Sequence, residues 1–298
     1  GLMAGLLEGV AKSMVFGTAK KTVLKMTHGH YPAPLKAIEV IRQTYGMSDR
    51  DAAMAIERAA FCEAAATDIS KSLIHVFELT ELVKKQNGVA SGAKARDVKH
   101  MGILGAGTMG GGIAYVAADK GVAVRMKDLN WEAISRGLKH AQDLWAKLLK
   151  KKAINAYEFH QKMTLVSGAL DFSGFKLMDV VVEAIVEDME IKKKVIRQTA
   201  EQMRPDGIIA TNTSSLSVTE MGEAHPHPEY FVGMHFFNPV HKMPLVEVIR
   251  GPKTSDETVA TIYELSKKMG KMPVVVKDGP GFLVNRLLLP YMGEAAFL

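Results

Sequence analysis

The feature that most constrains this chain is the glycine-rich segment Gly105-Ala106-Gly107-Thr108-Met109-Gly110, which directly follows the apolar run Met101–Leu104. Glycine permits a tight turn and lets a backbone approach a ligand where a side chain would block it. The small residues after Gly110 are typical of a helix packed closely on a sheet. We therefore expect a strand, a glycine turn and a helix that begins at the turn.

Asp128 closes the next apolar run, 128 − 110 = 18 residues after Gly110. In this context the turn and the free N–H groups of the helix bind a pyrophosphate, and the acid accepts hydrogen bonds from ribose hydroxyls. The acid would repel a 2′-phosphate, which favours NAD over NADP. Two alternatives stay open: FAD, for which no segment supplies a flavin-covering domain, and a turn needed only for packing.

From Val98 onward, short apolar runs alternate with helical stretches. The runs are 101–104, 122–124, 180–182, 208–210, 246–249 and 274–276, and the helical stretches are 109–120, 131–151, 191–203 and 257–269. This alternation predicts an α/β fold, a doubly wound, mostly parallel sheet of Rossmann type with helices on both faces. We expect this NAD-binding domain to span residues 96–281.

The remaining residues are expected to be helical. Residues 1–95 lack strand-like alternation, and residues 49–83 carry apolar side chains at helical spacing, with Ser48 and Asp51 resembling a capping box. Glu8 and Lys12 interrupt the apolar start too early for a transmembrane segment. The chain opens on Gly1 and its last five residues read as the middle of a helix, so we expect a fragment, with residues 282–298 starting a further helical domain.

Composition narrows the function classes. The net charge of +6 on 298 residues suits anionic small ligands better than nucleic acid, which would need basic residues clustered on one face. Cys62 is the single cysteine, which excludes an intramolecular disulfide and a cysteine-based zinc site. A reducing compartment is therefore expected, and no metal site is predicted.

A candidate base lies between Met234 and Glu247. Oxidation of an alcohol by NAD requires a base for the hydroxyl proton, and a histidine with a carboxylate partner serves near neutral pH. His235 follows the apolar run 231–234, at the carboxyl edge of an expected strand, and we pair it with Glu247. A packed core histidine is the alternative for His235, and His241 stays open as another base.

Two further segments place polar groups near this edge. Asn212–Ser215 follows the run 208–210, although one of its hydroxyls could serve as a helix N-cap. Residues 279–286 read as a turn leading into an apolar helix interrupted by Asn285 and Arg286. Tyr263 and Lys267 match the Tyr-x-x-x-Lys pair of short-chain dehydrogenases, but the glycine spacing and the missing upstream serine disagree. We expect that stretch to be a solvated amphipathic helix.

Five ordered motifs, LGAGTMG, VVEAIVED, ATNTSSL, MHFFNP and DGPGFLVNR, together resemble the L-3-hydroxyacyl-CoA dehydrogenase family over residues 96–298. The helical segment 1–95, with Tyr31-Pro32-Ala33-Pro34, resembles the C-terminal part of a crotonase-like domain and its linker. That order occurs in the multifunctional α subunit of fatty acid oxidation complexes, which also carries an enoyl-CoA hydratase site absent from these residues.

The resemblance implies that His235 is the catalytic base, oriented by Glu247, and that Ser214 and Asn285 bind the 3-oxygen of the substrate. The cofactor contacts implied for NAD are Gly105, Gly107, Met109, Gly110, Asp128, Glu183, Ala184, Ile185, Ser214 and Asn238. A lysine that contacts the cofactor in some members is replaced here by Glu190, with Lys192 and Lys193 nearby.

The implied reaction converts a (3S)-3-hydroxyacyl-CoA and NAD to a 3-oxoacyl-CoA and NADH. An acyl-CoA substrate, a thiolase β subunit as partner and a homo-oligomer are further implications, with a bacterial cytoplasmic location or, alternatively, the mitochondrial matrix. Two other functions stay open: a non-catalytic NAD-binding scaffold, and a dehydrogenase of free 3-hydroxy acids, because no segment visibly recognises CoA.

Overall fold

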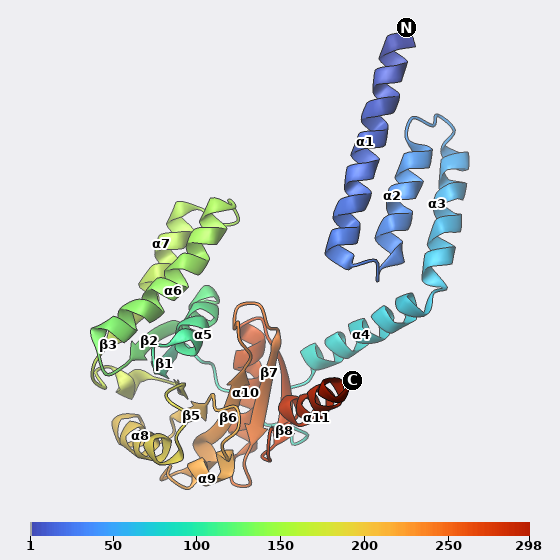
Figure 1. The fold of residues 1–298 in the computed structure, drawn as a ribbon. Coiled ribbons are helices and arrows are strands. Elements are labelled where there is room, and N and C mark those ends of the chain that lie inside the picture. Colours follow the sequence, from blue (N-terminus) through green and yellow to red (C-terminus); the bar gives the residue numbers. More distant parts are fainter. Residues whose placement is uncertain (1) are drawn as a thin grey trace. The chain divides into compact units, whose positions relative to one another are not determined.

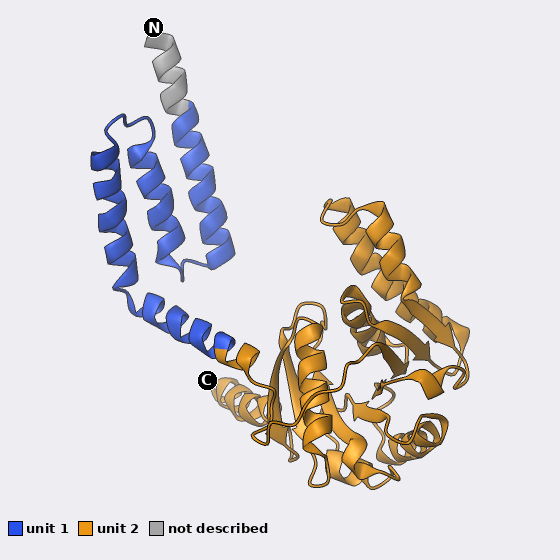
Figure 2. Cartoon of the chain, turned by 180° about the vertical axis from the view of Figure 1, so that it is seen from behind, with its two compact units in different colours: residues 1–81 blue, residues 82–298 orange. Residues whose placement is uncertain are grey.

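The computed structural model describes residues 2–298, with side chains from residue 11 onward, and it divides into two compact units, residues 1–81 and 82–298 (Figures 1 and 2). The boundary falls within one helix.

The first unit is helical, as the sequence predicts. It contains α1 (Leu2–Thr27), α2 (Pro32–Thr44), α3 (Arg50–Ala65) and most of α4 (Asp68–Lys85). Pro32 occupies the first turn of α2, where its missing N–H costs no hydrogen bond. The expected capping box at Ser48 is wrong, because the N-cap of α3 is Asp49, whose carboxylate accepts from the N–H groups of Asp51 and Ala52. No residue of α2, α3 or α4 is buried.

The second unit is a doubly wound α/β domain. Its strands are β1 (His100–Leu104), β2 (Ala123–Lys127), β3 (Val166–Ala169), β4 (Val180–Glu183), β5 (Ile208–Thr211), β6 (Phe231–Phe236), β7 (Leu245–Arg250) and β8 (Met272–Lys277). They form one sheet in the order β3-β2-β1-β4-β5-β6-β7-β8. All neighbouring pairs are parallel except β6 with β7. This confirms the expected Rossmann-type, mostly parallel sheet.

Helices cover both faces of this sheet. They are α5 (Thr108–Asp119), α6 (Trp131–Lys150), α7 (Ala156–Thr164), α8 (Met189–Gln202), α9 (Val218–Gly222) and α10 (Asp256–Lys268), with short 3-10 turns η1 (Phe175–Leu177) and η2 (Pro228–Tyr230). The last helix, α11 (Val284–Phe297), follows β8 and buries none of its residues. Two apolar clusters form the core. One joins α5, α6 and α10 to one face of the sheet, and the other joins η1, α8 and α9 to the opposite face.

Caps fix where these helices begin. Asn130 accepts from the N–H of Ala133 at the start of α6, and Asp188 accepts from the N–H of Ile191 at the start of α8. Such side-chain caps satisfy N–H groups that have no partner inside the helix. α6 follows β2 and α8 follows β4, so both caps fix the chain close to the carboxyl ends of these parallel strands.

The segment before β1 packs on α10. The hydroxyl of Tyr263 donates to the carbonyl of Val83, the ammonium of Lys267 donates to that of Gln86, and the N–H of Arg96 donates to the hydroxyl of Thr261. These contacts explain why the compact unit begins at residue 82, whereas the domain limits at residues 95/96 and 281/282 stay predictions. The expectation of a solvated helix is wrong for Tyr263, which is 2% exposed.

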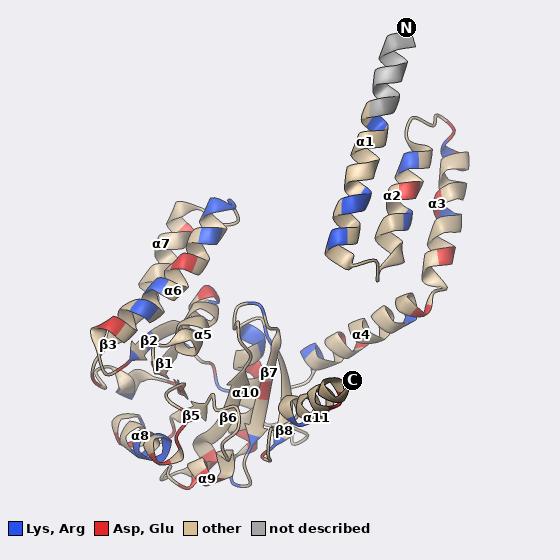
Figure 3. Cartoon of the chain, viewed as in Figure 1, with Lys and Arg blue, Asp and Glu red and all other residues tan. Residues whose placement is uncertain are grey.

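Charged side chains are spread over the helices of both units, with acidic and basic residues interspersed (Figure 3). Within residues 2–298, no helix combines the length and the hydropathy needed to cross a membrane. Among residues 11–298, whose side chains the structure describes, no three His, Cys, Asp or Glu gather as the ligands of a metal ion would.

Candidate active site

The glycine turn joins β1 to α5 and has the geometry that the sequence predicts. Gly105 has a φ of +93°, and a Cβ added there would lie 2.5 Å from the carbonyl oxygen of Ala184. A Cβ on Gly110 would lie 1.9 Å from the carbonyl oxygen of Gly105, whereas one on Gly107 would meet nothing within 4 Å. Gly105 and Gly110 are therefore required for packing, and Gly107 faces open space.

The N-terminus of α5 opens onto this space. Its N-cap is Gly107, so no side chain satisfies the first N–H groups of the helix. Unpaired N–H groups at a helix N-terminus form a ready site for a phosphate. A cradle without a Cβ beside free N–H donors is the arrangement that a dinucleotide pyrophosphate requires, so the residues present fit NAD.

A cavity of about 330 Å³ adjoins the turn. Its lining includes Gly105, Gly107, Asp128, Ala184, Ile185 and Val195. The carboxylate of Asp128 accepts from the N–H of Ala106 at 2.7 Å, which ties the end of β2 to the glycine turn. Asp128 is partly exposed to the cavity, where it can also accept from the hydroxyls of a ribose.

The expected cofactor residue Glu183 lies at the end of β4 with its side chain fully buried. Its carboxylate forms an ion pair of 2.6 Å with Lys192 and accepts from the hydroxyl of Thr211 and the N–H of Ile185. The side chain is thereby occupied within the protein, so any contact of Glu183 with a cofactor falls to its backbone. Lys193 is likewise engaged, with Glu190 and Glu220.

Glu187, which sequence reasoning did not single out, connects this buried pair to the loop after β5. One carboxylate oxygen of Glu187 lies 3.2 Å from the Lys192 ammonium, and the other accepts from the N–H of Ser214 at 3.0 Å and from the hydroxyl of Thr213. Burial raises the pKa of Glu187, but the hydrogen bond from Thr213 and the charge of Lys192 outweigh it and lower that pKa overall. An ionised Glu187 therefore holds the Ser214 loop in place.

His235 and Glu247 face each other across the antiparallel strands β6 and β7, where they occupy one register position. The Nδ1 of His235 and a carboxylate oxygen of Glu247 are 2.7 Å apart. His235 is 3% exposed and Glu247 is fully buried. Because an ionised carboxylate can only accept, Nδ1 carries a proton and Nε2 is left as a hydrogen-bond acceptor.

Glu247 is held in its ionised form. Its second oxygen accepts from the N–H groups of Leu283 and Val284, both at 2.9 Å. Burial raises the pKa of Glu247, but the hydrogen bonds from His235 and from these two backbone groups outweigh burial, and the pKa is lowered overall. A charged partner on Nδ1 stabilises the imidazolium that forms when Nε2 takes a proton.

Ser214 adjoins Nε2 of His235, and Asn285 contacts Ser214 in turn. The Oγ of Ser214 is 3.1 Å from Nε2, and the amide of Asn285, at the start of α11, donates to the carbonyl of Ser214 at 3.2 Å. Ser214 is exposed and Asn285 is half-buried, so both remain accessible from solvent. Asn238 is exposed on the turn after β6, and Met109 is half-buried in the first turn of α5. The structure therefore brings Ser214, His235, Glu247 and Asn285 together.

His241, left open above as another base, does not have this setting. Its Nδ1 is buried with no hydrogen-bond partner, and its ring lies edge-on to Tyr115. Burial, together with nearby positive charge, lowers the pKa of His241. An imidazole without a carboxylate partner is a weaker base than His235 with Glu247.

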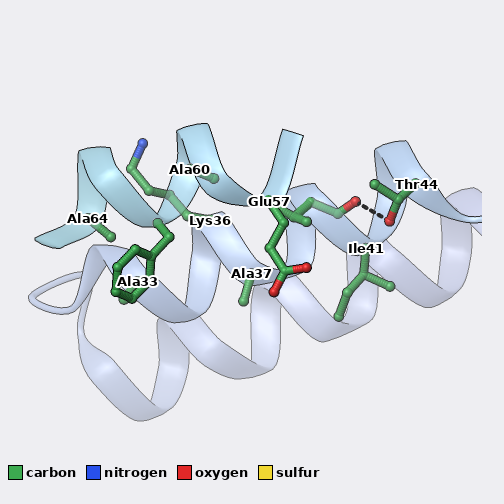
Figure 4. Close-up of a pocket in the computed structure, with 10 residues that line it drawn as sticks. Ala33, Lys36, Ala37, Ile41, Thr44, Glu57, Ala60 and Ala64 are labelled. Carbon is green, nitrogen blue, oxygen red and sulfur yellow. Dashed lines mark hydrogen bonds between the residues drawn. The ribbon is translucent and has the colours of Figure 1, made fainter. Parts of the chain in front are cut away.

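A separate hollow in the first unit has no histidine in its lining. It measures about 380 Å³ and lies between α2 and α3, with Ala33, Ala37, Ile41 and Ala60 among its lining residues (Figure 4). Its one lysine, Lys36, forms an ion pair with Glu63. Glu57 and Thr44 are the other polar residues of the lining, and the remaining side chains are small or apolar, so no histidine–carboxylate pair like that of His235 and Glu247 lines this hollow.

The fold and this site define a nicotinamide-dependent dehydrogenase domain, and comparison with known sequences specifies which. Residues 100–279, more than half of the chain, match the family described as "3-hydroxyacyl-CoA dehydrogenase, NAD binding domain", and the chain belongs to that family. NAD is therefore its cofactor.

Two curated relatives extend the match to nearly the whole chain. The fatty acid oxidation complex subunit alpha of Pseudomonas entomophila is 44% identical over 292 residues, which cover 98% of this chain and 41% of that protein. The subunit of the same name from Pseudomonas syringae pv. tomato is 45% identical over 293 residues, with 98% and 40% covered. The chain thus spans about two fifths of the length of these relatives.

Solved structures agree. (S)-3-hydroxybutyryl-CoA dehydrogenase from Ralstonia eutropha superposes with a TM-score of 0.65 at 40% identity, covering 67% of this chain and 70% of that one. 3-Hydroxybutyryl-CoA dehydrogenase from Escherichia coli K12 gives a TM-score of 0.65 at 36% identity, covering 67% and 42%.

Proposed function

We propose that this chain is the dehydrogenase core of an enzyme that oxidises a (3S)-3-hydroxyacyl-CoA to a 3-oxoacyl-CoA with NAD. The observation that carries the proposal is the hydrogen-bonded series Ser214–His235–Glu247 at the carboxyl edge of the sheet that bears the dinucleotide turn. Family membership and the names of the relatives support the choice of substrate.

In the proposed reaction, the C3–H bond of the substrate breaks as hydride leaves and the O–H bond breaks as a proton leaves. Bound NAD supplies the nicotinamide ring that accepts the hydride. Nε2 of His235 takes the proton, and Glu247 stabilises the resulting imidazolium. Ser214 and Asn285 bind the 3-oxygen, which becomes the oxygen of a ketone.

We propose that the cofactor lies along the carboxyl edge from the glycine turn to β6. Gly105, Gly107 and Gly110 form the pyrophosphate cradle and Asp128 binds the adenosine ribose. Met109, the backbone of Glu183 through Ile185, Ser214 and Asn238 line the path toward His235. The open space over Gly107 and the cavity beside Asp128 support this placement.

We further propose that the chain is part of a multifunctional α subunit with enoyl-CoA hydratase activity elsewhere in its sequence. Residues 1–95 would be the end of a crotonase-like domain with its linker, and residues 282–298 would begin a helical domain. The relatives are named as subunits of a complex, which supports a β subunit as partner. A thiolase as that β subunit, a homo-oligomer and a bacterial cytoplasmic location complete the proposal.

The test is NADH formation by the full-length protein that contains this chain. With (3S)-3-hydroxybutyryl-CoA and NAD we expect turnover, and we expect His235→Ala to reduce kcat by about 10²- to 10⁴-fold, the usual contribution of a positioned base. His241→Ala is the matched control and should retain kcat. Equal activity on free 3-hydroxybutyrate would favour the free-acid enzyme, and NAD binding without turnover would favour the scaffold.

A further inference from the structure

The turn between β8 and α11 touches the catalytic pair from a side that the proposed chemistry does not use. It runs from Asp278 through Gly281 and Phe282 to Val284. Phe282 has a φ of +49°, in the left-handed region that residues with a Cβ seldom adopt. Strained backbone of this kind persists where the surrounding structure requires it, and it gathers at functional sites.

The left-handed turn has a direct consequence for the catalytic carboxylate. It sets the direction of the next two N–H groups, those of Leu283 and Val284, which both donate to one oxygen of Glu247 at 2.9 Å. Leu283 is the N-cap of α11 and supplies no side-chain hydrogen bond to the helix. Glu247 therefore takes the place of a cap, and the positive end of α11 faces its charge.

The side chain of Phe282 contributes as well. It is 5% exposed, and its ring centroid lies 5.7 Å from that of His235. The rings of Phe282 and Phe237, the latter at 4.6 Å, therefore both pack near the imidazole. One residue thus positions both members of the pair, the carboxylate through its backbone and the imidazole through its ring.

We propose that Phe282 is a positioning residue for the dehydrogenase reaction, because its left-handed backbone directs the N–H groups that start α11 onto Glu247. The expected effect on kcat rests on the proposed function, whereas the contact of the Leu283 and Val284 N–H groups with Glu247 does not. On this proposal, His235 is correctly oriented only when the start of α11 is in place against Glu247.

Two substitutions separate the backbone effect from the loss of the ring. Phe282→Gly removes the ring and keeps the left-handed turn without strain, whereas Phe282→Val also removes the ring but resists that backbone conformation. Both are compared by NMR of the 298-residue chain labelled with ¹⁵N at Leu and Val, and by kinetics in the full-length protein.

We expect the amide protons of Leu283 and Val284 to resonate downfield in the unsubstituted chain and in Phe282→Gly, and to move upfield in Phe282→Val and in Glu247→Ala. We expect kcat to fall about tenfold further in Phe282→Val than in Phe282→Gly, with KM for NAD alike in both. Should Phe282→Val fail to fold, Phe282→Ala, which resists the turn less, replaces it in the same comparison.

The proposal is overturned if Phe282→Gly and Phe282→Val, or its replacement Phe282→Ala, show equal amide shifts and equal kcat. The backbone conformation of residue 282 would then have no effect on Glu247 or on the reaction. Absence of NADH formation in the unsubstituted protein would instead overturn the proposed function. The amide shifts would still decide whether the turn positions Glu247.

Discussion

Two substitutions in the glycine turn, Gly107→Ala and Gly110→Ala, each add one methyl group and should separate an effect on NAD binding from an effect on folding. Gly107 has a φ of −73° and no atom within 4 Å of an added Cβ, so alanine fits without strain. Replacement of glycine by alanine at a compatible position stabilises a fold by about 0.4–1 kcal/mol. The methyl nevertheless occupies the space that a pyrophosphate must approach, so we expect Gly107→Ala to weaken NAD binding.

The magnitude follows from packing. A methyl forced into an occupied volume costs about 1–3 kcal/mol, which corresponds to a rise of roughly fivefold to 150-fold in Kd for NAD. In Gly110→Ala the same cost falls on the fold, since the new Cβ would lie 1.9 Å from the carbonyl oxygen of Gly105. We therefore expect Gly110→Ala to lose about 1–3 kcal/mol of unfolding free energy.

Urea unfolding and calorimetric titration with NAD measure both quantities on the same samples. We expect a Gly107→Ala protein that is at least as stable as the unsubstituted chain and binds NAD weakly, and a Gly110→Ala protein that unfolds at lower urea. If Gly107→Ala binds NAD with unchanged Kd, the pyrophosphate does not lie over Gly107 and the reasoning is refuted.

Three further predictions concern buried polar groups. Burial lowers the pKa of His225 from 6.5 to about 4, so below pH 6.5 the unfolded chain binds a proton that the folded chain does not. Unfolding free energy should therefore fall by about 3 kcal/mol from pH 6.5 to 4 through this group, and His225→Asn should flatten the fall in urea titrations. Lys271 is 7% exposed, and its ammonium donates to the carbonyls of Val240 and Met243. Lys271→Met leaves these carbonyls without a donor and should lower the unfolding free energy by about 1–3 kcal/mol. An unchanged urea midpoint would contradict this prediction. Lys192→Met leaves Glu183 buried without its ammonium partner, so we expect the unfolding free energy to fall by about 3–5 kcal/mol in urea titrations. A fall of less than about 1 kcal/mol would count against an ionised Glu183.

Much of the fold follows from local sequence pattern. The apolar runs at 101–104, 180–182 and 208–210 became β1, β4 and β5, because strands buried on both faces need continuous apolar residues. β3 (Val166–Ala169) was not predicted, since this edge strand is short and its central residues are Ser167 and Gly168. The N-cap at Asp49 rather than Ser48 shows the usual error of one residue at a helix boundary.

The site was harder to derive from the chain alone. His235 and Glu247 are 12 residues apart, and only the antiparallel register of β6 and β7 brings them opposite each other. The roles of Leu283 and Val284 are carried by backbone N–H groups, which leave no side-chain signal in a sequence. Glu187 could have been noticed as an acid four residues after Glu183, but its link to Ser214 depends on a loop from another strand.

The most direct test of the central claim follows the hydride in a single turnover and compares the rate with and without the His235 base. The full-length protein is mixed with NAD and (3S)-3-hydroxybutyryl-CoA that carries deuterium at C3, and the mass of the NADH is measured with time. The account predicts one deuterium in the NADH and a rate lower by about 10²-fold or more in His235→Gln. Unlabelled NADH, or an unchanged rate in His235→Gln, would contradict it.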